Sequence, residues 1–66
     1  MQELIYKGYR VQYHCVEVWF AIIFRPGSPR AMGGSDITAT REEGEEVLLS
    51  RVRARIDQEE SAATQS

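Results

Sequence analysis

The 66-residue chain has little of what a small domain can use to reinforce a limited core. It contains one cysteine, Cys15, so it cannot form an internal disulfide. One cysteine and one histidine also cannot supply the four ligands of a structural zinc site. Secreted domains of this size usually depend on several disulfides, which favours a reducing compartment. We therefore expect a cytoplasmic protein that binds no metal and no cofactor.

Long apolar runs and an excess of positive charge are also missing. The run over residues 18–24 has seven residues, against the ~20 that span a bilayer. The chain does not open with a basic segment, an apolar stretch and a cleavage site, so no membrane partner is expected. Eight Lys and Arg against ten Asp and Glu give a net charge of −2, which argues against indiscriminate binding to nucleic acid.

What remains has the composition of a folded domain, with 42% hydrophobic and 27% charged residues. We expect a single α+β domain over residues 1–58 and a disordered polar tail over residues 59–66. Residues 9–15 alternate between apolar and polar positions, which predicts a strand with one buried face. Residues 4–6 are placed at the start of the same strand, with a bulge or bend at Lys7-Gly8.

Residues 18–24 are apolar without a break, which indicates a strand that needs cover on both faces. We expect the helix to cover one side, formed by Val18, Phe20, Ile22 and Phe24. The other side, formed by Trp19, Ala21 and Ile23, then needs a second source of cover. Residues 14–17 lack the Gly, Asn or Asp of a two-residue hairpin turn. The apolar phase is expected to slip there, and the chain could continue as a long bent ribbon whose first part pairs with another molecule.

A loop is predicted over residues 25–36, which hold both prolines and three of the five glycines. A short third strand follows, with Ile37 and Ala39 on one face. Thr40 and Glu43 fit a capping box, which predicts a helix over residues 41–57. The helix should pack on the sheet through one stripe, formed by Leu48, Leu49, Val52 and Ile56.

Two groups of residues suggest catalysis or metal binding, and neither is convincing. His14 and Cys15 are neighbours in a predicted strand, where side chains point to opposite faces, so they should not form a nucleophile and base pair. An acidic cluster could bind a divalent cation, but negative charge at the start of a helix explains it without a ligand; its members are Glu42, Glu43, Glu45 and Glu46.

Two other groups suggest contacts with phosphate. Arg53 points nearly opposite to Arg51 and Arg55 on a helical wheel, and seven acidic residues share residues 41–66 with four arginines. The loop glycines, Gly27, Gly33 and Gly34, precede neither a Lys-Ser/Thr pair nor a helix. We therefore interpret the arginines as a solvated surface and the glycines as a flexible connection. No catalytic, metal-binding or cofactor-binding residue is predicted.

Four motifs carry a resemblance to a known group of domains: Tyr6-Lys7-Gly8-Tyr9, Trp19-Phe20-Ala21, the segment ATREEGEE over residues 39–46, and Ile56-Asp57. Over residues 4–58 the chain resembles small bacterial domains related to the HicB-like antitoxin fold. The resemblance implies a three-stranded antiparallel sheet backed by one helix, a β-β-β-α order. It also implies a role in binding a small toxin.

The leading hypothesis is a non-enzymatic homodimer that assembles through its sheet, with or without exchanged strands. A chain this short buries only ~60% of its unfolded surface, so a second copy would supply missing cover. The predicted interface residues are Tyr9, Val11, Tyr13, Trp19, Ala21 and Ile23. The alternative is a HicB-like antitoxin or regulatory protein that binds a small basic protein.

Overall fold

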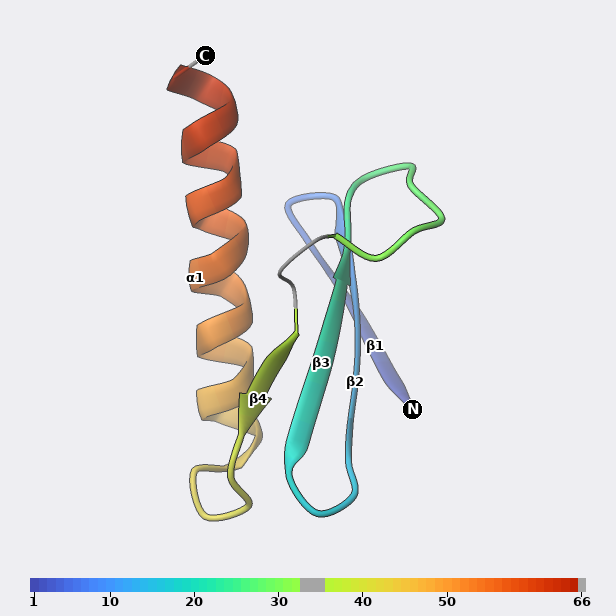
Figure 1. Ribbon diagram of the computed structural model, residues 1–66, viewed down its shortest axis with the longest axis vertical. Helices are drawn as coiled ribbons and strands as arrows, with labels where there is room; N and C mark the ends of the chain where they lie inside the picture. The colour runs from blue at the N-terminus through green and yellow to red at the C-terminus, as the bar shows by residue number, and fades with distance from the viewer. Residues whose placement is uncertain (33–35, 66) are drawn as a thin grey trace.

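The described residues form one four-stranded antiparallel sheet, in which the strands lie side by side in chain order, and one long helix follows them (Figure 1). The computed structural model describes residues 1–32 and 36–65. The strands are β1 (Gln2–Tyr6), β2 (Tyr9–Cys15), β3 (Trp19–Phe24) and β4 (Ile37–Ala39), and the helix is α1 (Gly44–Gln65). The expected α+β class and antiparallel sheet are confirmed, whereas the expected number of three strands is wrong.

The additional strand comes from the turn at Lys7-Gly8. Both residues have positive φ, 52° and 85°, as the two central residues of a type I′ hairpin turn do. The pairing of Tyr6 with Tyr9 closes the hairpin directly around them. The prediction of a bulge inside one strand is therefore wrong, because the chain reverses here and β1 becomes the edge of the sheet.

The connection between β2 and β3 is also a tight reversal. Cys15 pairs with Trp19, so only residues 16–18 lie in the turn. Paired residues share a face of the sheet, and both members of this pair have odd numbers, so the apolar phase continues across the turn. The predicted phase slip and the long bent ribbon are therefore wrong.

The helix covers the face of β3 opposite to the expected one. Ala21 and Ile23 are fully buried beneath α1, while Phe20, Ile22 and Phe24 lie on the other face and are half-buried. The core beneath the helix consists of Tyr9, Val11, Tyr13, Ala21, Ile23, Met32, Ala39, Leu48, Val52 and Ile56. Of the predicted helical stripe, Leu48, Val52 and Ile56 are buried and Leu49 packs against the core in a half-buried position.

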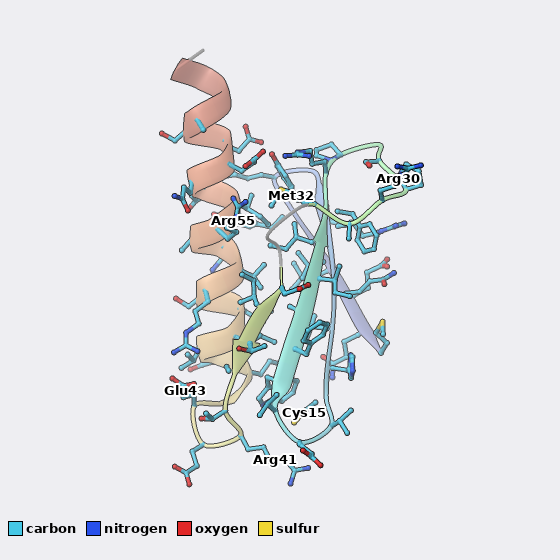
Figure 2. The ribbon with its side chains drawn as sticks, viewed as in Figure 1. Cys15, Arg30, Met32, Arg41, Glu43 and Arg55 are labelled. Carbon is cyan, nitrogen blue, oxygen red and sulfur yellow. The ribbon has the colours of Figure 1, made fainter. Side chains whose placement is uncertain are left out.

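The predicted loop contributes one residue to the core that was not predicted. Met32 is 3% exposed and lies between the upper part of α1 and the sheet (Figure 2). Its amide donates to the carbonyl of Ile23 at 2.7 Å, which fixes the returning chain beside β3. Ile37 and Ala39 share a face in β4, as predicted. Residues 33–35 of the predicted loop, including Gly33 and Gly34, lie outside the described residues.

The predicted capping box forms, but it precedes the helix. The Thr40 amide donates to Glu43 Oε1 at 2.9 Å and the Glu43 amide donates to Thr40 Oγ1 at 3.1 Å. Gly44 then takes a φ of 82°, where the chain turns into α1. The helix extends to Gln65, past the predicted end at residue 57, so residues 59–65 of the predicted tail are helical and Ser66 lies outside the described residues. No Gly or Pro follows Asp57 to end the helix.

Candidate functional site: the helix-free face of the sheet

One face of the sheet carries no helix of the described part of the chain, and we call it the open face. Figure 1 shows α1 along one side of the sheet only. The strand register places Phe24 beside Arg10, Ile22 beside Gln12 and Phe20 beside His14. The open face therefore consists of the residues Glu3, Ile5, Arg10, Gln12, His14, Phe20, Ile22, Phe24 and Thr38.

The apolar part of the open face is a row along β3. Phe20, Ile22 and Phe24 are each half-buried, and no layer formed by residues 1–32 or 36–65 lies above them. Ile5 adds a further apolar side chain from β1 and is 63% exposed. Apolar side chains gathered on an uncovered sheet face are typical of a surface that meets another molecule.

The polar part of the open face lies mainly on β2. The Arg10 guanidinium stacks over the Phe24 ring, 4.6 Å from its centroid. Arg10 Nε is buried and has no hydrogen-bond partner among the described residues; the carboxylate of Glu3 lies 4.0 Å away and accepts from Gln12 Nε2 at 3.2 Å. The His14 ring lies 6.0 Å from the Phe20 ring, and its Nδ1 is likewise buried without a partner in the described part of the chain.

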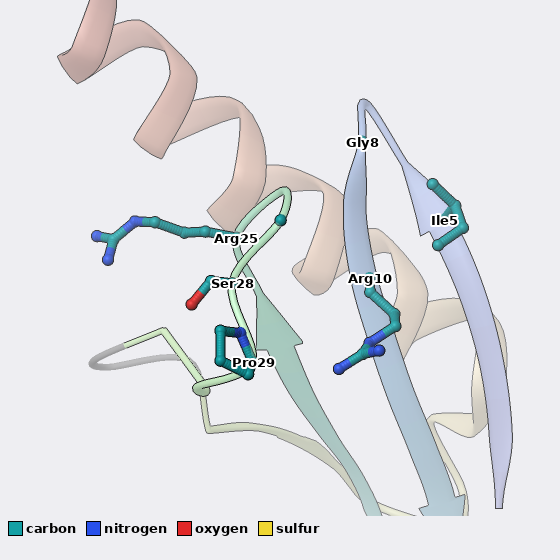
Figure 3. A pocket seen from close by; sticks show the side chains of 7 residues that line it. Ile5, Gly8, Arg10, Arg25, Ser28 and Pro29 are labelled. Carbon is teal, nitrogen blue, oxygen red and sulfur yellow. The ribbon is translucent and has the colours of Figure 1, made fainter.

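A hollow of about 630 Å³ adjoins the open face at the Phe24 end of β3. The residues that line it are Ile5, Gly8 and Arg10 of the first hairpin and Gly27, Ser28 and Pro29 of the loop. Figure 3 shows the Arg10 guanidinium directed toward Ser28 and Pro29. Arg25 also borders the hollow, but its guanidinium points away, where it pairs with Glu59 at 2.7 Å.

The six residues predicted as an interface all lie on the face that α1 covers. Five of them are buried in the core, and Trp19 is half-buried against it, with its ring 6.4 Å from that of Tyr13. Burial raises the pKa of the Tyr13 hydroxyl, which donates to Glu45 Oε1 at 3.2 Å. The predicted interface residues therefore hold one copy together in this structure, and the surface left for a partner is the open face.

The candidate catalytic pair and the candidate metal-binding cluster do not form sites in the described residues. His14 lies on the open face and Cys15, the next residue of β2, points to the other side, so the two side chains diverge. Glu43 is engaged by Thr40 and Arg51, and no group of three His, Cys, Asp or Glu that could hold a metal occurs within the described ranges. Arg51 also donates to the Thr38 carbonyl at 2.9 Å.

No protein-family model matches the chain, and no curated protein and no solved structure matches it. The resemblance to the HicB-like antitoxin fold therefore stays a prediction. Within residues 1–32 and 36–65, no helix is both long and apolar enough to cross a membrane.

Proposed function

We propose that the protein is a non-enzymatic module that forms a homodimer through the open face of its sheet. The observation that supports the proposal is the row of Phe20, Ile22 and Phe24, which has sheet neighbours but no covering layer among the residues that the structure describes. Two sheets that pack face to face bury such rows against each other. The residues of the open face would then play the part that the sequence alone assigned to Trp19, Ala21 and Ile23.

The charge of the open face favours a second copy as the occupant. Its ionised side chains are Arg10 and Glu3, which balance each other, while seven of the ten acidic residues lie in residues 41–66, on and beside the helix. A balanced surface can meet itself without repulsion, whereas a surface for a basic partner should carry an excess of negative charge. The HicB-like alternative, with its small basic partner, is for this reason our second choice.

The area of the open face sets the expected strength of the dimer. From the rise per residue along a strand and the distance between neighbouring strands, the face formed by β1, β2 and β3 measures roughly 20 by 15 Å. A standard interface buries about 800 Å² per partner, which would be about a fifth of the 4395 Å² of accessible surface. A face of about 300 Å² is well below that standard size, so we expect a dimer of weak affinity. The single Cys15 supports a cytoplasmic setting for it.

The test is the molar mass in solution, measured by sedimentation equilibrium at concentrations up to about 500 μM. The wild type should approach twice the monomer mass, and Ile22→Lys should remain a monomer because it places a charge in the middle of the apolar row that the dimer would bury. Ser50→Lys is the matched control, since Ser50 is exposed on α1, and it should dimerise like the wild type. Circular dichroism should show both variants folded.

Two results would overturn the proposal. A wild-type protein that keeps the monomer mass throughout the concentration series does not use the open face for self-association. A folded Ile22→Lys variant that dimerises like the wild type would place the interface elsewhere on the molecule.

A further inference from the structure

The hollow beside the open face is bordered by the guanidinium of Arg10, which stacks on an aromatic ring and whose Nε has no hydrogen-bond partner among the described residues. Arg10 is held from one side by the Phe24 ring at 4.6 Å and lies opposite Ile5 in the neighbouring strand. Arg10 Nε is buried and has no acceptor among the described residues, so an external acceptor would meet the terminal nitrogens of the guanidinium instead. The guanidinium is directed into the hollow (Figure 3).

The walls of the hollow indicate the chemistry of what it can hold. Ile5 and Pro29 are apolar, and the Ser28 hydroxyl is already engaged with the backbone of Arg30 at 3.2 and 3.3 Å. The volume of about 630 Å³ lies within the range of small-molecule sites. An apolar body would contact the walls, and a carboxylate would match the planar fork of the guanidinium with two parallel hydrogen bonds.

We propose that this hollow binds a small organic acid, with its carboxylate on Arg10 and its aromatic or aliphatic body against Ile5 and Pro29. The site is complete within one copy of the chain, and it shares Ile5 and Arg10 with the open face, so a homodimer would compete with the ligand. Its natural competitor is Glu3, the nearest carboxylate to Arg10, at 4.0 Å from Nε. Glu3 partly neutralises the guanidinium and therefore limits the affinity for an external carboxylate.

The test is a titration with benzoate, followed by the amide shifts of Gly8 and Ser28 in NMR spectra. Benzoate should bind with a dissociation constant on the order of 1 mM, as its few non-hydrogen atoms allow, and benzamide should not bind. Arg10→Gln should weaken benzoate binding at least tenfold and Arg10→Lys several-fold, because lysine keeps the charge but loses the fork. Arg30→Gln, which removes an exposed arginine outside the hollow, should bind as the wild type does.

Glu3→Gln gives a readout that a misfolded variant cannot imitate, because it should increase the affinity for benzoate several-fold. The proposal is overturned if benzamide binds as well as benzoate, or if Arg30→Gln weakens binding as much as Arg10→Gln. It is also overturned if Glu3→Gln leaves the affinity unchanged or lowers it. Because Ile5 and Arg10 also belong to the open face, the titration is done at a protein concentration at which sedimentation shows a monomer, so that its outcome is separate from the test of the homodimer.

Discussion

Ile22 and Ile23 are the same residue type at adjacent positions of one strand, yet they lie in different environments. Ile23 is fully buried between the sheet and α1, whereas Ile22 is half-buried on the open face. Hydrophobicity along β3 therefore does not decide which face the helix takes. The decision depends on the residues that pairing brings beside each face.

The neighbouring strand supplies the difference. Pairing places Val11 beside Ile23, so the face beneath the helix is apolar on both strands. On the open face, pairing places the polar Gln12 beside Ile22. A helix on the first face buries more apolar surface, and it leaves fewer buried polar groups without hydrogen-bond partners. The helix thus selects the face on which β2 and β3 are both apolar.

The comparison is tested most strongly by shortening each isoleucine in turn. Ile23→Ala should lower the free energy of unfolding by about 2–5 kcal/mol, the cost of a cavity in a packed core. Ile22→Ala should cost only about 1 kcal/mol in the monomer, because its side chain has no covering layer. Urea unfolding followed by the fluorescence of Trp19, at a concentration below that of assembly, measures both values. Equal losses would mean that the open face is as well covered as the core.

The same two faces differ in how well they could be predicted from the amino-acid sequence. The alternation over residues 9–15 identified Tyr9, Val11 and Tyr13 as one buried face, and the structure confirms that face. The spacing in the helix likewise identified Leu48 as a core position. The unbroken apolar run of β3 has no period, so its buried face could be assigned only from the register with β2, which the length of the turn determines.

Three other features were missed for physical reasons. Lys7-Gly8 forms a hairpin turn although turns of this type favour Asn or Asp before Gly, so the separate strand β1 was not predicted. Met32 is an apolar residue isolated in a loop, where no periodicity indicates burial. The helix continues beyond Asp57 because residues that favour helices follow it and tertiary contacts such as Arg25 with Glu59 hold the added turns.

The attachment of β1 to the sheet can be weakened without touching the core. Gly8 has a φ of 85°, and a Cβ there would lie 3.3 Å from Pro26 Cγ, so Gly8→Ala adds a close contact to backbone strain. We expect a loss of about 1–2 kcal/mol in the free energy of unfolding. Gly27→Ala is the matched control, because its φ of 71° is strained but its Cβ would meet nothing within 4 Å. If both variants lose the same stability in urea unfolding, the contact with Pro26 has no effect.

The smallest expected effect is that of pH, because exposed ion pairs hold α1 at the edges of the covered face and at its own start. Lys7 pairs with Asp57, Arg25 with Glu59 and Arg51 with Glu43. The Lys7 ammonium lowers the pKa of Asp57, Arg25 lowers that of Glu59, and the Thr40 amide together with Arg51 lowers that of Glu43.

A carboxyl whose pKa is lower in the folded state stabilises that state above its unfolded pKa, near 4, and loses this contribution as the pH falls through the folded pKa. The free energy of unfolding should therefore decrease from about pH 5 downward. In Glu43→Gln this acid dependence should be shallower, so that its stability deficit against the wild type is present at pH 7 and shrinks at pH 3. Urea unfolding at the two pH values measures the deficit. A deficit that stays constant with pH would show that Glu43 acts through its hydrogen bonds alone and that its charge contributes nothing to holding the start of α1.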